Sequence, residues 1–131
     1  MSFLLDTHIA LWAVTNSPRV PPFVRAHIEN PDTAIWVSAA SVWEISIKHA
    51  LGQRRSDAMP ISGEAALAAF AGTGFDILAI TGPHATTAGD LPLLHADPFD
   101  RMLVAQAMLE GLVLITHDRK LSAYHPGIIV V

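Results

Sequence analysis

Two carboxylates stand three residues apart in the stretch His95–Glu110, which reads HADPFDRMLVAQAMLE. Pro98 suits the first turn of a helix, Asp97 before it is a strong N-cap, and Asp100 falls within the first turn. The rest of the helix is apolar on almost every side, as expected of a buried helix, and Gly111 provides a C-cap. Because residues three apart lie on the same side of a helix, both carboxylates are expected at its N-terminal end, where they could bind a cation.

Three further acids lie beside other predicted elements. Asp6 follows the apolar run 3–5, and Asp118 follows the apolar run 113–116. Both runs are typical of buried strands. Glu44 falls in the first turn of a predicted helix. The carboxylates therefore lie at strand ends and helix starts.

Strands that alternate with helices predict a parallel sheet covered on both faces. In such a fold the carboxyl ends of the strands and the N-termini of the helices share one edge of the sheet, so four acids should meet there. These acids are Asp6, Glu44, Asp100 and Asp118. Four converging carboxylates repel one another, and a hard divalent cation relieves that repulsion. We expect Mg²⁺ at this edge, with Mn²⁺ as an alternative.

The whole pattern predicts an α/β fold: a three-layer sandwich with a central, mostly parallel sheet of about five strands, forming a single domain over residues 1–131. Strands are expected at residues 3–5, 34–37, 75–80, 113–116 and 128–131. Helices are expected at about residues 9–14, 21–30, 41–51, 62–71, from 83 onward, and 98–110, with a single helical turn at 121–124.

Each acid also has a purely structural explanation. Glu44 could complete a capping box with Ser41, and Asp97 could act only as an N-cap. Asp6 could be an ordinary turn residue, and Asp118 a solvated charge. Their shared edge, rather than any one of them, favours a functional site.

Histidines and tryptophans offer other interpretations. His8, His95 and His117 lie beside or near these acids, and imidazoles together with carboxylates would also suit zinc, manganese or iron. No usual ligand spacing such as His-Glu-x-x-His is present, so we expect hydrogen-bonded histidines at the rim of the site. Three tryptophans are expected in the core or at an interface rather than stacked on bases. They are Trp12, Trp36 and Trp43.

Composition limits the partners. The 12 acids and 8 bases give a net charge of −4, which argues against binding nucleic acid by bulk attraction. If four acids surround a metal, the remaining 8 acids balance the 8 bases, so nucleic acid is not excluded as a substrate. The hydrophobic fraction of 51% predicts a dense core and an apolar surface for self-association.

The same composition bears on location. No apolar run approaches the roughly 20 residues that a membrane span needs, so no membrane association is expected. Residues 1–5 lack the basic segment of a signal peptide, which predicts a cytoplasmic protein. The absence of cysteine excludes disulfides and thiolate metal sites.

Three stretches closely resemble PIN-domain proteins of the VapC type, which are the toxins of bacterial toxin–antitoxin pairs. These stretches are LLDTHIALWAV, VSAASVWEISIKHALG and HADPFDRMLVAQAMLEGLVLITHD. The resemblance spans nearly the whole chain. It implies a Mg²⁺-dependent endoribonuclease that hydrolyses RNA phosphodiesters, is neutralised by a small antitoxin protein and forms a homodimer.

By position, the resemblance assigns the family's acidic quartet to Asp6, Glu44, Asp100 and Asp118. Thr116 matches a hydroxyl position that borders the family's metal site, and Asp97 is a candidate supporting residue. Arg101 and Lys48 are expected to contact phosphates as positioning charges. The basic turn 118–121 departs from many relatives, which have a less basic turn ending in an aromatic residue, and leaves the fourth acid less firmly placed.

Two alternatives remain open. A regulatory module of receiver type also carries carboxylates and Mg²⁺ at this edge, but receivers need paired acids after the first strand and a late lysine. Here Asp6 stands alone, and Lys120 lies beside an acid that the receiver pattern does not need. A catalytically silent binding module is disfavoured because all four acids are present.

Overall fold

The computed structural model describes residues 1–131 and contains one sheet of five strands in the order β3-β2-β1-β4-β5. Every neighbouring pair is parallel. The strands are β1 (Ser2–Leu5), β2 (Ala34–Ser38), β3 (Asp76–Leu78), β4 (Val113–Thr116) and β5 (Ile129–Val130). The predicted α/β sandwich is confirmed, and its sheet is parallel throughout.

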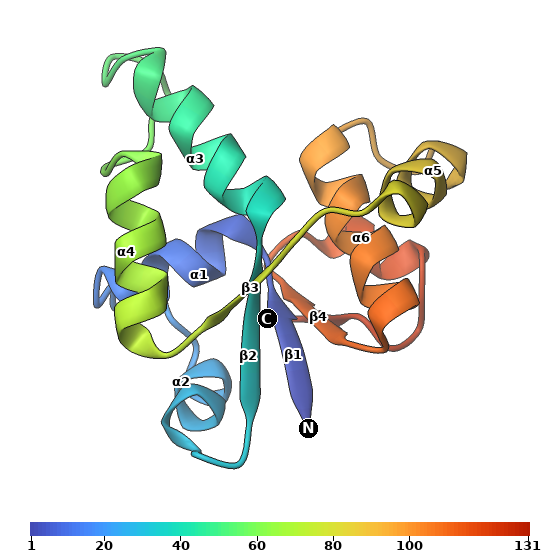
Figure 1. Ribbon diagram of the computed structural model, residues 1–131, viewed down its shortest axis with the longest axis horizontal. Helices are drawn as coiled ribbons and strands as arrows, with labels where there is room; N and C mark the ends of the chain where they lie inside the picture. The colour runs from blue at the N-terminus through green and yellow to red at the C-terminus, as the bar shows by residue number, and fades with distance from the viewer.

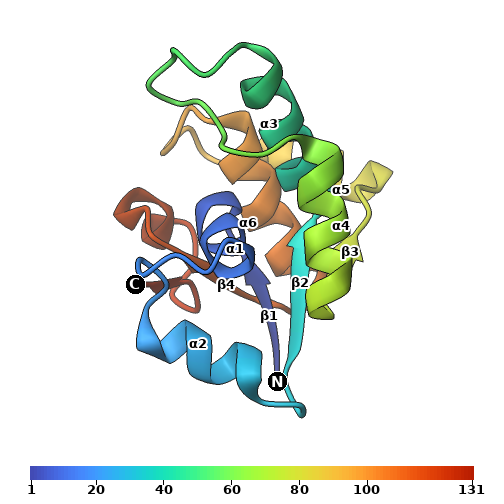
Figure 2. The same cartoon turned by 90° about the vertical axis from the view of Figure 1, so that its left-hand side faces the viewer.

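Six α-helices and one 3₁₀ helix surround the sheet. They are α1 (Thr7–Val14), α2 (Pro22–Glu29), α3 (Ala39–Ala50), α4 (Gly63–Thr73), α5 (Gly82–Asp90), α6 (Pro98–Glu110) and η1 (Arg119–Ala123). Helices α1, α2 and α4 lie on one side of the sheet, and α5 and α6 lie on the other (Figure 1). Figure 2 shows the molecule from the side of α1, α2 and α4. None of these helices has the length and apolar character needed to cross a membrane.

Strand β1 divides its side chains between two hydrophobic cores. Phe3 and Leu5 belong to the larger core, whereas Leu4 packs with Leu103 and Leu114 in the smaller one. All five side chains are essentially inaccessible to solvent. Burial stabilises each by roughly 1.5–3 kcal/mol. A shift of one residue would exchange the two faces, so this packing fixes the register and places Asp6 at the end of the strand.

The order in which strands are added to the sheet reverses beside β1. It passes from β1 to β2 and β3 on one side, and later returns to β4 and β5 on the other. In open parallel sheets, ligands bind at such a switch point, outside the carboxyl ends of the strands. Asp6 leaves β1 at this point, and its amide donates a hydrogen bond to the carbonyl of Ile115 in β4. The residues that follow β1 and β4 therefore lie side by side.

The two edge strands are shorter than predicted. Strand β3 was expected over residues 75–80 but pairs only through Asp76–Leu78, because its partner β2 ends at Ser38. Strand β5 was expected over residues 128–131 but consists of Ile129–Val130, which pair with the last two residues of β4. An edge strand ends where its neighbour ends.

Helix α3 begins before the predicted position. Its N-cap is Ser38, whose Oγ accepts a hydrogen bond from the amide of Ala40 at 3.0 Å. Ser41 lies inside the helix, where its hydroxyl accepts a hydrogen bond from Thr7. The predicted capping box of Ser41 and Glu44 is therefore wrong. The reason is that Ser38, the last residue of β2, already has the extended backbone that an N-cap requires.

Arg101 is a structural residue, contrary to the prediction that it contacts phosphates. It is only 8% exposed, and one guanidinium nitrogen donates hydrogen bonds to the carbonyl of Pro92 and the hydroxyl of Tyr124. The other donates to three carbonyls around the end of α5, those of Ala88, Gly89 and Leu91. The guanidinium thus holds the α5–α6 connection and is not available to a phosphate.

We predict that Arg101→Met lowers the free energy of unfolding by about 2–4 kcal/mol, because several buried carbonyls would lose a charged donor. Urea denaturation measures the change. The matched control is Arg119→Met, at an exposed arginine, which should stay within about 0.5 kcal/mol of the wild-type protein. Equal stability of Arg101→Met and wild type would contradict the structural role.

Candidate active site

A polar cavity of about 210 Å³ lies at the carboxyl edge of the sheet, where β1 and β4 end. No apolar side chain lines it. The lining residues are Asp6, Thr7, His8, Glu44, Lys48, His95, Asp97, Asp100, His117 and Asp118. The structure thus brings the four predicted acids together in one cavity, with Asp97 beside them.

Asp6 is the most constrained acid of the cavity. It is 3% exposed, and its Oδ1 caps α1 by accepting a hydrogen bond from the amide of Ile9 at 2.9 Å. Its Oδ2 accepts hydrogen bonds from the hydroxyl of Thr116 at 2.6 Å and from the amide of His117 at 3.0 Å. Burial opposes ionisation, but hydrogen bonds from His117, Thr116 and Ile9 outweigh it and lower the pKa of Asp6. Asp6 is therefore a buried but ionised carboxylate.

Thr116 connects the first and the fourth acid. While its hydroxyl donates to Asp6, the same oxygen accepts a hydrogen bond from the amide of Asp118 at 3.0 Å. Asp118 in turn caps η1 through the amide of Lys120. Burial works against ionisation of Asp118, but hydrogen bonds from His95 and from this amide lower its pKa. The predicted hydroxyl at the border of the site therefore positions two carboxylates.

Glu44 lines the cavity and has one buried carboxylate oxygen without a partner. The residue is 3% exposed, and its Oε2 forms an ion pair with Lys48 at 2.6 Å. Its Oε1 is buried and has no hydrogen-bond partner. A buried acceptor without a partner is unfavourable unless a donor or a cation satisfies it. A divalent cation would be a suitable partner for this oxygen.

Asp97 and Asp100 have different roles at the start of α6. Asp97 is the N-cap, as predicted, because its Oδ1 accepts hydrogen bonds from the amides of Phe99 and Asp100. Burial, followed by the negative charges of Asp97, Glu44 and Asp6, raises the pKa of Asp100 to about 7. Without a cation, Asp100 is therefore about half protonated near pH 7.

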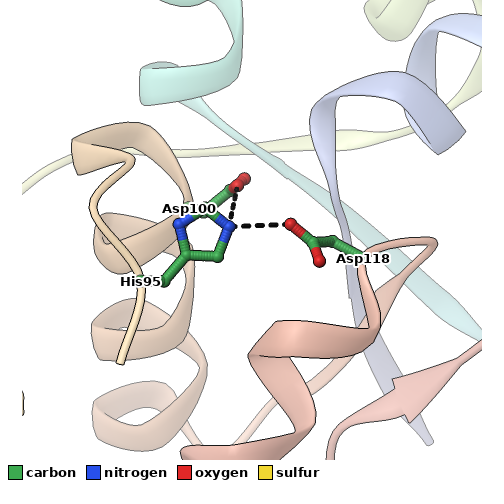
Figure 3. Close-up of side chains that lie close together, drawn as sticks. All are labelled: His95, Asp100 and Asp118. Carbon is green, nitrogen blue, oxygen red and sulfur yellow. Dashed lines mark hydrogen bonds and ion pairs between the residues drawn. The ribbon is translucent and has the colours of Figure 1, made fainter. Parts of the chain in front are cut away.

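His95 joins the third and fourth acids (Figure 3). Its Nε2 lies 2.7 Å from Oδ2 of Asp118 and 3.5 Å from Oδ2 of Asp100. The ligand atoms of these three groups all lie within 4.8 Å of one another, so the groups are close enough to share a metal ion. However, Nδ1 of His95 accepts a hydrogen bond from the amide of Asp97, so a neutral ring carries its proton on Nε2. In this arrangement His95 donates a hydrogen bond to Asp118 and does not offer a free ligand nitrogen to a metal.

The rings of His8, His117 and Trp12 form a cluster beside Asp6. The centroids of the His8 and His117 rings are 5.1 Å apart, and those of His117 and Trp12 are 5.3 Å apart. Burial lowers the pKa of His8, whereas the hydrogen bond to Asp6 raises that of His117. His95 and His117 are hydrogen-bonded at the site, as predicted, whereas the ring of His8 makes no hydrogen bond. Sequence reasoning missed Trp12, although its spacing of four residues from His8 places both on one side of a helix.

The chain matches the PIN domain family over residues 3–125. This chain belongs to the PIN-domain family. The resemblance inferred from the sequence motifs is therefore confirmed. The match also decides against the receiver-type module. No curated protein matches the chain at significant similarity.

Several solved structures share the PIN fold of this chain. VapBC2 from Rickettsia felis, bound to a promoter DNA fragment, is 16% identical with a TM-score of 0.70, covering 100% of this chain and 98% of that one. DNA-bound VapBC from Salmonella typhimurium is 20% identical with a TM-score of 0.68, covering 100% and 97%. A toxin–antitoxin complex from Klebsiella pneumoniae is 22% identical with a TM-score of 0.65, covering 98% and 96%. At these identities the likeness establishes the fold.

The donor set of this PIN domain fits a hard divalent cation. The groups facing the cavity are mainly carboxylate oxygens, which Mg²⁺ and Mn²⁺ prefer. The unpartnered Oε1 of Glu44 and the raised pKa of Asp100 both indicate negative charge that the protein alone does not balance. A cation would be a partner for Oε1 of Glu44, and it would cause Asp100 to release its proton.

We predict that the metal-free protein loses stability as the pH rises from about 4 to about 7 through Asp100. Folded Asp100 holds its proton up to about pH 7, whereas the unfolded chain releases it near the ordinary value of 3.8. The folded state binds more protons between these values, so stability falls as the pH rises. Mg²⁺ should raise the melting temperature more at the higher pH, because it binds the ionised form. Calorimetry with EDTA and with Mg²⁺ measures both effects.

The control for this prediction is Asp100→Asn, which removes the titrating group. His8, with a lowered pKa, makes stability rise with pH, and His117, with a raised pKa, makes it fall with pH. Both histidines are present in both proteins, and Asp100 is the smallest of the five causes of the shift of the His117 pKa, so the difference between the two pH profiles is mainly that of Asp100. Parallel profiles for wild type and Asp100→Asn would contradict the raised pKa.

Proposed function

We propose that this PIN-domain protein is a Mg²⁺-dependent endoribonuclease that acts as the toxin of a type II toxin–antitoxin pair. The observation that carries the proposal is the acid cavity at the switch point of the sheet, with the unpartnered oxygen of Glu44 among its carboxylates. PIN-domain proteins are typically nucleases that use a divalent metal. The structural neighbours from toxin–antitoxin complexes support the biological role.

Four carboxylates would hold the cation: Asp6, Glu44, Asp100 and Asp118. A bound divalent cation polarises a phosphodiester and lowers the pKa of water for attack on phosphorus. The chain's own residues prepare the site. Thr116 and the amide of His117 hold Asp6 in place as an ionised group, and His95 orients Asp118. Lys48 forms an ion pair with one oxygen of Glu44 at the cavity wall. Of the two bases that were expected to contact phosphates, Lys48 lines the cavity and Arg101 does not.

We predict that the purified protein cleaves single-stranded RNA only with added Mg²⁺ or Mn²⁺, and that Asp100→Asn abolishes cleavage without unfolding the protein. Asp97 and Pro98 still start α6 in that variant. Asp97→Asn keeps a side-chain oxygen that can cap the helix, so its activity should fall only about 10- to 100-fold. Single-turnover rates and melting temperatures measure the difference.

The matched control is Asp76→Asn, at an exposed carboxylate on β3 outside the cavity, which should keep full activity. Expression of the wild type should slow bacterial growth, and expression of Asp100→Asn should not. Cleavage in excess EDTA would reject the metal mechanism. If Asp100→Asn cleaves RNA at a near-normal rate and Asp97→Asn is inactive, the assignment of Asp100 as a metal ligand is wrong.

We also infer that the protein binds a small antitoxin and forms a homodimer. An apolar patch beside the acid cavity supports self-association. Trp43, which is 60% exposed, meets Phe99 with ring centroids 5.4 Å apart, and Ile80 is 40% exposed beside them. Exposed aromatic residues on an apolar patch are typical anchors of protein interfaces. Because Trp43 adjoins Glu44, such a dimer would hold its two acid cavities near the interface.

We predict that Trp43→Glu converts a dimer into a monomer, because a charge would be buried in the apolar interface. Light scattering at micromolar concentration measures the mass. Leu67→Glu, at an exposed leucine on α4 outside the patch, is the control and should remain dimeric. A monomeric wild-type protein under these conditions would reject the inference.

A further inference from the structure

A second cavity, of about 350 Å³, adjoins the acid cavity and has no role in the function proposed above. His8 lies in the walls of both cavities. The second cavity is bounded by α1, by residues 15–19 after it, and by residues 56–60 of the connection between α3 and α4. This connection arches above α1 in Figure 2. The two cavities are therefore neighbours, and a ligand long enough to pass His8 could occupy both.

Trp12 provides an aromatic surface in this second cavity. The sequence alone places Trp12 in the core or at an interface, and part of the residue does pack against the larger core. The side chain is only half-buried, however, and lines the cavity. Its ring centroid lies 6.2 Å from that of His8 and 5.3 Å from that of His117, and His117 is hydrogen-bonded to Asp6. The ring of His117 therefore links the first acid to Trp12.

Arg19 adds a positive charge to the same wall. Its guanidinium carbon lies 5.5 Å from the centroid of the Trp12 ring. The side chain is exposed, and no acid forms an ion pair with it. A guanidinium without an acidic partner is able to turn from the ring to a phosphate. An aromatic ring next to such a cation is the combination with which proteins bind single-stranded nucleic acids.

We propose that the second cavity binds one nucleotide of a single-stranded RNA, next to the phosphate that enters the acid cavity. The base stacks on Trp12 and the adjoining phosphate pairs with Arg19. The inference rests on the proposed nuclease function and names a substrate contact for it. The strand must be single-stranded there, because a paired and stacked base has no free face for Trp12.

A protein partner fits this cavity less well than RNA does. Helical peptides bind grooves through a continuous apolar face. Here the walls mix Trp12 and Met59 with hydroxyls and charges, namely those of Thr15, Ser17, Arg19, Ser56 and Asp57. The cavity also adjoins the acid cavity at His8, and a substrate phosphate is expected in the acid cavity whereas an apolar helix is not.

The test compares steady-state cleavage of a single-stranded RNA by matched variants. Trp12→Leu should raise KM about 5- to 150-fold, the range expected for loss of one stacked base, with a smaller change in kcat. Trp12→Phe keeps a ring and should retain most of the affinity. Arg19→Gln should raise KM and weaken its dependence on salt, because one phosphate contact is lost. Arg25→Gln, at an exposed arginine on α2 outside both cavities, should leave KM unchanged.

A second measurement identifies the nucleotide. A single abasic residue is moved stepwise along the RNA, and wild-type KM should rise at one position beside the cleavage site. The same abasic substitution should have no further effect in Trp12→Leu, because both changes remove the same contact. The Mg²⁺-induced rise in melting temperature should remain in every variant. If Trp12→Leu does not fold, the exposed Arg19→Gln and the abasic scan on the wild type decide the question.

The outcomes separate this inference from the proposed function. In one outcome the wild type cleaves RNA, but KM is unchanged in Trp12→Leu and Arg19→Gln and no abasic position raises KM. This outcome would overturn the inference and leave the proposed function intact. Loss of antitoxin binding in these variants with an unchanged KM for RNA would also overturn it. If the wild type cleaves no RNA, the proposed function fails. Fluorescence anisotropy of the same RNA then tests binding alone, and equal affinities of wild type and Trp12→Leu would overturn the inference.

Discussion

The buried carboxylate of Asp6 joins three parts of the chain, and the geometry of the site depends on it. One oxygen caps α1, and the other accepts hydrogen bonds from Thr116 and His117 at the end of β4. The hydrophobic packing of β1 delivers the residue to this point, and the hydrogen bonds keep it ionised there. An amide in its place would turn N–H groups toward donors, so the charge of Asp6 cannot be removed without disturbing the strand ends. Asp100 lacks such contacts, and its charge can be separated from its structural role.

The convergence of the four acids could be predicted because it follows from local signals and one general rule. Apolar runs mark the strands, caps mark the helices, and a parallel sheet brings strand ends and helix starts to the same edge. The same logic failed for the start of α3. Ser38 and Ser41 are both good N-caps, and only the length of β2, which is set by pairing with β1 and β3, decides between them. Because α3 begins at Ala39, Glu44 lies in the second turn of the helix. It is still at the carboxyl edge of the sheet, but its side chain does not cap the helix.

Arg101 and Trp12 show why proximity in sequence is a poor guide to side-chain direction. Arg101 follows Asp100 by one residue, but successive residues on a helix point about 100° apart. Its side chain accordingly faces α5 and Tyr124 instead of the acids. Trp12 lies one helical turn beyond His8 and so shares its side of α1. Whether such a ring is covered or open depends on Arg19 and on residues 56–60, which no local pattern places beside it.

The electrostatics of the cavity divide the acids into two kinds. Asp6 and Asp118 have lowered pKa values because fixed donors surround them, whereas burial and neighbouring charges raise the pKa of Asp100 to about 7. A cation entering the cavity therefore displaces a proton from Asp100, which couples cation binding to pH. Until a cation binds, the cavity repels a phosphate, so an RNA strand needs a positive charge outside it. Arg19, beyond His8 and Trp12, is in the right place to supply that charge, and a chain with a net charge of −4 would then attract RNA locally rather than over its whole surface.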